Sequence, residues 1–451
     1  MSSPVIRQKS NYCAAFTQNK LYIHINSKLH IDFAVILLYL LKNTPKGYLM
    51  RNKFSKELLS LVGLNGFFYF AWSWGCYQTL YLQENGMTTS DIGMLNAVTS
   101  VVAIFASTFW GVISDKINSI KKTMIANFLF LIVFTLFLPL LPTEAKYSTV
   151  MFIIYCSMLT FARSPSFTLM DNISIRNCTS SGLNYGAIRS FGSLTYTVGS
   201  ILVAAVMSII SVKNTFVISA LMMIPTLLFL LMCTDPKVVL TKKKAGPDKE
   251  SIKKLFKSYY YVTFLVFALL FFIPRAGEFA FLTYFMEDYN IPLDNVGLIM
   301  AIRAGLEIPF LFFINAIRKK IRLKHLIIIS AICVAVECLG FGLLARDFAS
   351  VLVFSAFFGL GNGIFIGVIS VYLFRLAPEE LKATAQSIYA SVTAISSILG
   401  NLLGGFAYEM FGGSTFYVIL GSTVVLSCLV LWLTTYIGNK KGLVNPADEL
   451  G

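Results

Sequence analysis

The chain has 451 residues, of which 56% are hydrophobic and only 13% are charged, and its mean hydropathy is +0.72. A soluble chain of this length would carry about 25% charged residues, so this composition excludes an ordinary water-soluble globular protein and indicates a membrane protein. The formal net charge of +15 does not indicate nucleic-acid binding, because the Lys and Arg residues lie in short segments between apolar runs.

The sequence predicts no enzymatic or metal chemistry. Its eight cysteines are scattered, mostly within apolar runs, and form no CxxC pair. The three histidines, at positions 24, 30 and 325, lie outside the apolar runs. Neither a Walker A motif nor an HExxH motif occurs. We therefore expect no metal, no cofactor, no direct use of ATP and no enzyme.

The first segment, residues 1–56, differs from the rest of the chain. Its longest apolar stretch, Phe33 to Leu41, is too short to cross a bilayer, and Lys42 follows where a signal peptide would carry small residues. Two interpretations stay open. The segment is either a disordered tail or an overlong reading frame that begins before Met50, or it contains a short helix at the membrane interface.

Twelve windows after this segment are long and apolar enough to span a bilayer, where only a helix satisfies its own backbone. They lie near 57–83, 92–112, 123–141, 148–170, 184–210, 214–233, 259–286, 294–317, 324–345, 348–376, 383–408 and 415–437. A Lys-rich connector with Pro and Gly, residues 234–258, follows the sixth window. We expect an all-α membrane protein with six-helix bundles at 57–233 and 259–437 and a tail at 438–451.

Lys and Arg residues gather in alternate loops. One set of loops holds nearly all of them, including the eight Lys of the connector, whereas the other set holds only Lys146, Lys213 and Arg346. Since basic loops stay in the cytoplasm, both termini and the connector are predicted to be cytoplasmic, in a multi-pass protein of the cell membrane.

A charged segment follows the second window: Gly111-Val-Ile-Ser-Asp115-Lys116, with two more Lys a few residues on. It resembles the Gly-x-x-x-Asp-Arg/Lys loop of the major facilitator superfamily, although Ser119 stands where that family has Gly. The resemblance implies the major-facilitator fold of two six-helix bundles. Physically, Asp115 lies beside a helix end, where dipoles and cations can hold it, so we expect Gly111, Asp115 and Lys116 to form a conformational latch.

A second motif begins the fifth window, where residues 185–193 are Tyr-Gly-Ala-Ile-Arg-Ser-Phe-Gly-Ser. This segment is similar to the signature of the oligosaccharide:proton symporter group, which includes lactose permease and phenylpropionate-permease-like proteins. The resemblance implies proton-coupled symport, with Asp171 and Arg189 binding sugar hydroxyls. A guanidinium and a carboxylate suit a polyol because they offer fixed donors and acceptors. Alternatively, the two residues form a structural ion pair, or Asp171 lies in the aqueous loop.

Charged residues within the windows are a third signal, because each costs at least about 2.5–3.5 kcal/mol in a spanning helix and needs a partner or a watery cavity. Arg275 and Glu278 lie three residues apart, and Arg303 and Glu307 lie four apart, so each pair can share a helix face. We expect Glu278 and Glu307 to carry the coupled proton. The alternative is that these pairs are struts between helices.

The ninth, tenth and eleventh windows depart from the symporter group. Glu337 lies near the place where related symporters carry an Arg. Lactose permease uses His and Glu on its tenth helix for coupling, whereas residues 357–372 and 386–405 here contain no ionisable acid or base of that kind. The proton pathway of lactose permease therefore cannot be transferred to this chain.

Polar and aromatic side chains complete the predicted binding site. They follow helical spacing on the first window or lie in the second half, and a Trp or Tyr face can stack on a pyranose or an aromatic acid. These residues are Asn65, Tyr69, Trp72, Asn362, Gln386 and Tyr389. The alternative for each is ordinary packing or anchoring at the membrane interface.

Together these patterns predict a proton-coupled secondary transporter that imports a sugar or similar small organic solute by alternating access. We expect the partners to be a small-molecule substrate, a proton and the lipid bilayer, and the protein to be monomeric. An exporter of drugs or metabolites and a non-transporting membrane sensor stay open as alternatives.

Overall fold

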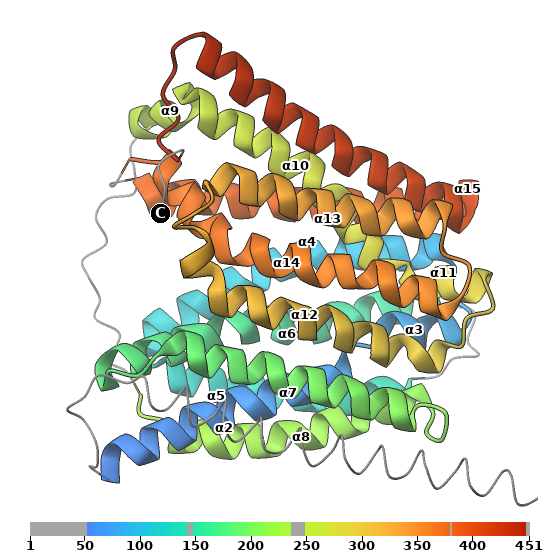
Figure 1. Cartoon of the computed structure of the whole chain (residues 1–451). Helices are drawn as coiled ribbons and strands as arrows, with labels where there is room; N and C mark the ends of the chain where they lie inside the picture. The colour runs from blue at the N-terminus through green and yellow to red at the C-terminus, as the bar shows by residue number, and fades with distance from the viewer. Residues whose placement is uncertain (1–51, 142–147, 236–248, 379–380, 448–451) are drawn as a thin grey trace, which may run out of the picture.

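Helices make up nearly all the regular structure of the computed structural model, which describes residues 52–141, 148–235, 249–378 and 381–447 (Figure 1). Residues 1–51 lie outside the described ranges, so the two interpretations of the first segment stay predictions.

The first half of the chain forms six long helical segments, of which the first is broken into two helices. They are α2 (Asn52–Gly75) with α3 (Gln78–Glu84), α4 (Thr89–Ile117), α5 (Ile120–Phe137), α6 (Ser148–Ser181), α7 (Tyr185–Val206) and α8 (Val212–Met232). A short 3-10 helix, η1 (Leu138–Leu140), follows α5, and α9 (Lys249–Lys257) lies in the connector.

The second half repeats this plan. It contains α10 (Tyr259–Ala280) with α11 (Leu282–Asp288), the 3-10 helix η2 (Leu293–Asn295), α12 (Val296–Ile317), α13 (Leu323–Leu343), α14 (Phe348–Leu376) and α15 (Lys382–Lys440). Non-helical backbone at Gly412, with φ 73°, divides α15 into two arms that run in opposite directions. Eight of the described helices are long and apolar enough to cross a membrane, with α15 counted once. The second arm of α15 and helices α2, α7 and α12 complete the twelve predicted spans.

The two halves pack as separate bundles. In the first, α2 packs on α7 and α8, and α6 packs on α4 and α5. In the second, α10 packs on α15, and α14 packs on α12 and α13. Figure 1 shows α2, α5, α7 and α8 of the first bundle in the lower part of the view and α10, α13, α14 and α15 of the second in the upper part. Helix α4 meets α15 and α7 meets α12 across the boundary, which completes the predicted twelve-helix major-facilitator fold.

The halves meet closely at one end of the molecule, which we call the far end because it lies opposite the connector. A Cβ atom added to Gly93 on α4 would lie 2.6 Å from the backbone oxygen of Asn401 on α15, and one on Gly297 would lie 2.8 Å from Ala204. The Tyr284 hydroxyl donates to the Met87 carbonyl at 2.5 Å, and Gln83 donates to Glu287. The far end is therefore closed.

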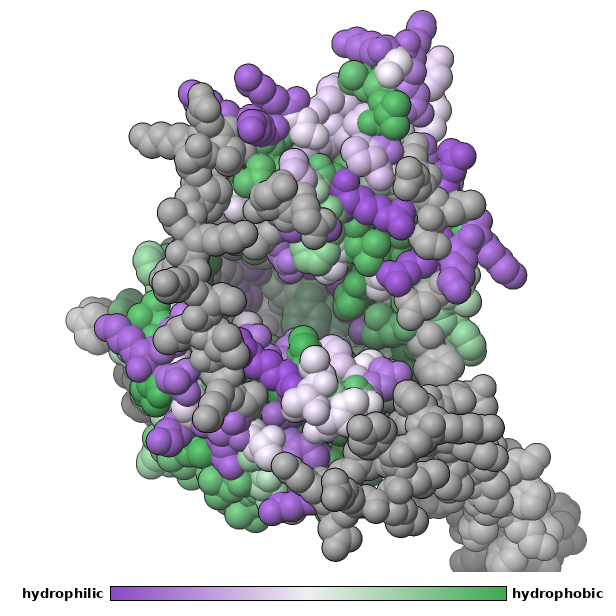
Figure 2. Space-filling view, turned by 90° about the vertical axis from the view of Figure 1, so that its left-hand side faces the viewer, coloured by the Kyte–Doolittle hydropathy of each residue, from purple (hydrophilic) through white to green (hydrophobic). Residues whose placement is uncertain are grey.

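The opposite end, which we call the linker end, is open. It carries α9 and the end of α15, on the left of Figure 1. Figure 2 looks onto this face and shows a hollow between the two halves, with hydrophobic residues on its inner wall. The structure is thus a conformation with access from the linker end only.

Two predicted boundaries were wrong. Helix α6 continues past residue 170 to Ser181, so Asp171 lies within a helix rather than in a loop. Helix α4 continues to Ile117, so Asp115 lies in its last turns, and the turn itself falls at Asn118, which has φ 52°. Hydropathy locates the apolar slab, whereas a helix can project beyond it and carry polar residues there.

Substitution of Gly93 should loosen the far end. A Gly93→Leu side chain would collide with the backbone of α15, which cannot move aside as a flexible side chain can, and such overpacking costs about 1–3 kcal/mol. Amide hydrogen exchange in residues 89–97 and 401–409 should therefore accelerate about tenfold. Phe105→Leu, which changes a residue of the same helix that is 69% exposed, is the control. Unchanged exchange in Gly93→Leu would contradict this view of the contact.

Candidate functional site

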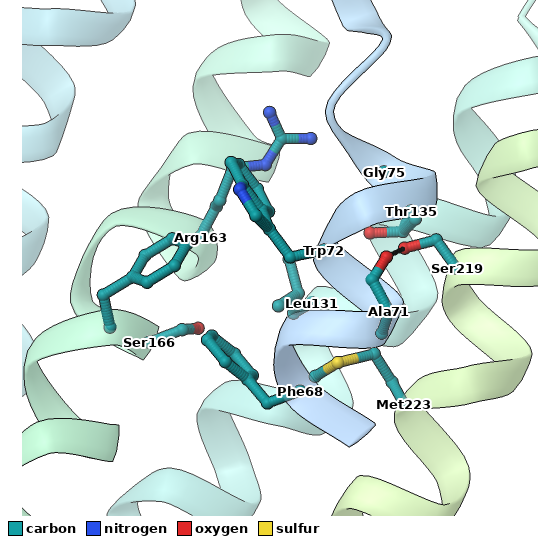
Figure 3. Close-up of a pocket in the computed structure, with 11 residues that line it drawn as sticks. Phe68, Ala71, Trp72, Gly75, Leu131, Thr135, Arg163, Ser166, Ser219 and Met223 are labelled. Carbon is teal, nitrogen blue, oxygen red and sulfur yellow. Dashed lines mark hydrogen bonds between the residues drawn. The ribbon is translucent and has the colours of Figure 1, made fainter. Parts of the chain in front are cut away.

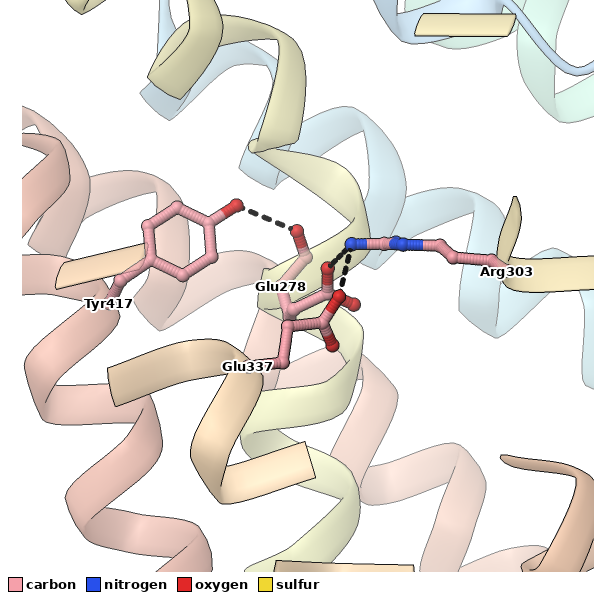
Figure 4. A network of polar contacts seen from close by, with 4 residues as sticks. All are labelled: Glu278, Arg303, Glu337 and Tyr417. Atoms are coloured by element: carbon pink, nitrogen blue, oxygen red, sulfur yellow. Dashed lines mark hydrogen bonds and ion pairs between the residues drawn. The ribbon is translucent and has the colours of Figure 1, made fainter. Parts of the chain in front are cut away.

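A buried group of three charged residues lies inside the second half. The Arg303 Nη2 atom on α12 donates to Glu278 Oε1 on α10 at 2.5 Å and to Glu337 Oε1 on α13 at 2.6 Å (Figure 4). Both glutamates are fully buried, and Arg303 is 4% exposed. The Tyr417 hydroxyl donates to the backbone oxygen of Glu278 at 2.9 Å and fixes this part of α10. We call Arg303, Glu278 and Glu337 the Arg303 cluster.

The Arg303 cluster contains one positive and two negative groups when all three are ionised. Several polar atoms of the cluster are buried without a hydrogen-bond partner in the described part of the chain. They are Oε2 of each glutamate and Nε and Nη1 of Arg303. Two carboxylates held against one guanidinium repel each other, and a single proton on either removes the surplus charge. The arrangement can therefore hold one exchangeable proton as a property of the pair of acids.

The pairing expected along single helices was wrong. Glu307 does not pair with Arg303; its Oε2 atom accepts a hydrogen bond from Asn362 Nδ2 at 2.8 Å. Arg275 donates to the Oδ1 atom of the same Asn362 instead of pairing with Glu278. Asn362, on α14, thus joins Arg275 to Glu307, because the inward-facing side chains of α10 and α12 reach neighbouring helices.

An aromatic ring that the sequence did not single out, that of Phe358, lies against both Arg275 and Arg303. The guanidinium of Arg275 lies 4.6 Å from the centroid of the Phe358 ring, and that of Arg303 lies 4.7 Å from it. A ring face attracts a cation, most strongly away from water. Phe358 therefore stabilises both arginines, and no sequence pattern could single it out because Phe is common in every apolar run.

In the first half, Asp171 and Arg189 do not form an ion pair within the described residues. The Asp171 carboxylate accepts a hydrogen bond from the Tyr185 hydroxyl at 2.8 Å. Arg189 donates to Ser193 Oγ at 3.1 Å, and its guanidinium lies 4.1 Å from the centroid of the Tyr69 ring. Both charged side chains are half-buried and have only neutral partners, so each keeps hydrogen-bonding capacity for a ligand.

The other predicted binding residues have different surroundings in the structure. Asn65 is buried and donates to Ser174 at 3.1 Å, so it ties α2 to α6 and does not face a cavity. Tyr389 stacks on Phe264 at 5.9 Å between ring centroids, and Gln386 is exposed on α15. Trp72 lines a cavity, as described next.

A cavity of about 440 Å³ lies between the halves. Its wall includes Trp72 and Arg163 from the first half and Arg275 from the second. Arg163 on α6 donates to Gln78 at 2.9 Å, and its guanidinium lies 5.2 Å from the centroid of the Trp72 ring. We call this space the interhalf cavity. Arg163 was visible in the sequence as a charge within a span, but no partner for it could be predicted.

The other face of Trp72 closes a second, much smaller space inside the first half. Figure 3 shows Arg163 and Trp72 above this pocket, with Ser219 donating to the Ala71 carbonyl on its opposite wall. Its volume is about 20 Å³, enough for a single water molecule. This pocket is too small for a solute, whereas the interhalf cavity is large enough, and Trp72 and Arg163 line both spaces.

The predicted latch residues lie at the linker end. Gly111, Asp115 and Lys116 are exposed on the last turns of α4. The acid that binds the start of α5 is Asp235, which accepts hydrogen bonds from Ser119 Oγ at 2.5 Å and from the backbone N–H of Lys121. The latch role of Asp115 stays a prediction.

Two helical bundles that contain the twelve predicted spans, a cavity between the bundles and buried charges on both sides of it define a transporter class of membrane protein. A family model described as the MFS_1 like family matches residues 61–419, and the chain belongs to this family of the major facilitator superfamily. The resemblance inferred from the two sequence motifs is confirmed. The chain is an integral membrane transporter and not an enzyme.

The similar proteins agree with this class. The chain is 25% identical to the uncharacterized transporter YwbF of Bacillus subtilis strain 168, over 82% of this chain and 91% of that protein. It is 23% identical to the maltose permease of Geobacillus stearothermophilus, over 79% and 88% respectively. Its fold is similar to a crystal structure of the nucleoside transporter NupG, with a TM-score of 0.68, 18% identity and coverage of 85% and 99%.

Removal of the shared cation should destabilise the protein through the two acids that it leaves behind. Arg303→Met leaves Glu278 and Glu337 buried without a counter-ion, which should cost about 3–5 kcal/mol and lower the thermal unfolding temperature in detergent. The triple variant with Glu278→Gln and Glu337→Gln added should recover most of that loss.

The control for this comparison is Arg322→Met, which changes an exposed arginine at the start of α13 and should unfold at the wild-type temperature. If the triple variant is no more stable than Arg303→Met alone, the loss does not come from uncompensated acids.

Proposed function

We propose that this protein is a secondary active transporter that carries a sugar or similar small organic solute together with a proton by alternating access. The observation that supports this most is the Arg303 cluster, a buried group with one more acid than base, in a protein whose halves are closed at one end and open at the other. The similarity to a maltose permease supports a sugar-like solute.

Alternating access needs two ends that open in turn. The far-end contacts between the halves include close backbone approaches at Gly93 and Gly297 and a hydrogen bond from Tyr284 to Met87, so opening of this end would separate glycine contacts and polar contacts. Rocking of the two bundles around the interhalf cavity would then open the far end and close the linker end, where Asp115 would act as the latch.

Proton coupling is assigned to Glu278 and Glu337 in this proposal. Glu307 is the other candidate, but its carboxylate has an amide partner, Asn362, and no second acid bonded to the same cation. A proton on the Arg303 cluster removes a surplus charge from a fully buried site, whereas a proton on Glu307 removes a charge that is only half-buried.

Solute binding is assigned to the first half and the interhalf cavity. Arg189 and Asp171 offer a fork of donors and a pair of acceptors, and Trp72, which lines the interhalf cavity, offers an aromatic ring. Loop charge places the linker end in the cytoplasm, so the open state described here would be the inward-facing state of a monomer in the cell membrane.

Solute accumulation in proteoliposomes tests this proposal. With an imposed pH gradient, the wild type should accumulate at least one of maltose, sucrose, xylose, uridine, glucuronate and glucose 6-phosphate. Glu278→Gln and Glu337→Gln should each keep solute counterflow but lose accumulation driven by the pH gradient, because the coupled proton has lost its site. Glu307→Gln should keep both.

The matched control is Asp347→Asn, because Asp347 is exposed and caps α14. Hydrogen bonds from the Ser350 side chain and backbone lower the pKa of Asp347, so it stays ionised in this assay. Absence of uptake and counterflow for every solute would favour a sensor. Solute movement that drives protons in the opposite direction to the solute would favour an exporter. Full accumulation in both glutamate variants would move the proton site elsewhere.

A further inference from the structure

We propose that the solute is a small hydroxylated organic anion whose acidic group binds between Arg163 and Arg275 in the interhalf cavity, and that it crosses with one proton. This inference rests on the proposed transport function and narrows its substrate class. Three observations support the inference separately: the charge of the cavity, the partners of the two arginines and the charge balance of the core.

The cavity is positively charged. Among the described residues, its lining includes the two guanidinium groups of Arg163 and Arg275 and no carboxylate. The remaining walls are neutral amides and hydroxyls, such as Gln78, Asn96 and Asn401, and aromatic rings such as Trp72. Such walls suit a molecule with hydroxyl groups and one acidic group, and about 440 Å³ lies within the usual size range of ligand pockets.

Neither arginine forms an ion pair within the described residues, although the charges of Glu278, Glu337 and Glu307 act on Arg275 at longer range. Arg163 has an amide partner, Gln78, and the face of Trp72, whereas Arg275 has Asn362 and the face of Phe358. The Nη1 atom of Arg275 is buried without a hydrogen-bond partner. Neutral partners satisfy hydrogen bonds but do not cancel charge, so an anion is the ligand that these groups lack.

The two arginines belong to different halves, since Arg163 lies on α6 and Arg275 lies on α10. An anion that contacts both would attract the two halves toward each other around the cavity. Because the strength of these contacts changes as the halves rock, the ligand would bind one conformation more tightly than another and so shift their populations.

The charged residues within the spans also indicate which ion would be transported together with the anion. Four arginines and four acids lie within or at the edge of the predicted spans and balance when all are ionised: Arg163, Arg189, Arg275, Arg303, Asp171, Glu278, Glu307 and Glu337. A monovalent anion leaves this core with a surplus negative charge in a medium that disfavours it. A proton bound by the Arg303 cluster restores neutrality. Co-transport of one proton with one monovalent anion would then be electroneutral.

Three probes that share one sugar ring test the inference: glucuronate, glucose 6-phosphate and glucose carry a carboxylate, a phosphate or a hydroxyl group at the same carbon. At least one anionic probe should stabilise the purified full-length protein against heat and accumulate under a pH gradient, whereas glucose should do neither. The anion that acts identifies the acidic group. A valinomycin-imposed potential should not change the rate for glucuronate.

Arg163→Gln and Arg275→Gln should each weaken binding of the active anion about tenfold or more, with Arg322→Gln as the exposed control. If a glutamine variant does not fold, Arg163→Lys and Arg275→Lys replace it, because they keep the charge. Each lysine variant should bind the anion more weakly than the wild type does, but still more tightly than it binds glucose.

The possible outcomes separate the two proposals. Glucose accumulation without an effect of either anion would overturn the anion inference and leave the transport proposal intact. Thermal stabilisation by an anion without accumulation would support the anion site and count against proton-coupled transport. If no probe stabilises the protein or accumulates, or if both glutamine variants bind the anion as the wild type does, the inference is wrong.

Discussion

Charge compensation in a medium without water is the constraint on which this structure depends. An arginine or a glutamate inside the hydrocarbon slab must find its partners within the protein or in a water-filled cavity, because the lipid supplies none. The second half meets this constraint with a direct ion cluster of Arg303, Glu278 and Glu337, which joins α12, α10 and α13. The first half meets it with neutral groups: Arg163 and Arg189 lie against the rings of Trp72 and Tyr69.

This difference between the halves is the basis of the different roles proposed for them. A fully buried cluster is held firmly by three helices and suits a small, fixed change such as binding one proton. Half-buried arginines with neutral partners keep unsatisfied attraction for an anion and suit a ligand that must enter and leave. The interhalf cavity lies where these two kinds of site meet, so binding of a solute and of a proton can influence each other through charge alone.

The sequence was sufficient to predict the architecture, because each span can be recognised from its hydropathy and each cytoplasmic loop from its basic residues. Residue types at the site were also predictable, since a charged residue within a span is rare. Their partners were not predictable. Spacing along one helix paired Arg303 with Glu307, whereas the long guanidinium reaches two neighbouring helices whose packing no single-helix pattern encodes. In the same way, hydropathy ended the fourth span before Asp171, although α6 continues to Ser181.

Proton uptake on binding tests the central claim most directly, namely that the balanced core charge couples the solute to the proton. It can be measured for the anion that the protein accumulates, from the dependence of the calorimetric binding heat on the ionisation enthalpy of the buffer. About one proton should be taken up per monovalent anion bound, and none in the Glu278→Gln/Glu337→Gln variant. Anion binding to the wild type without proton uptake would contradict the claim.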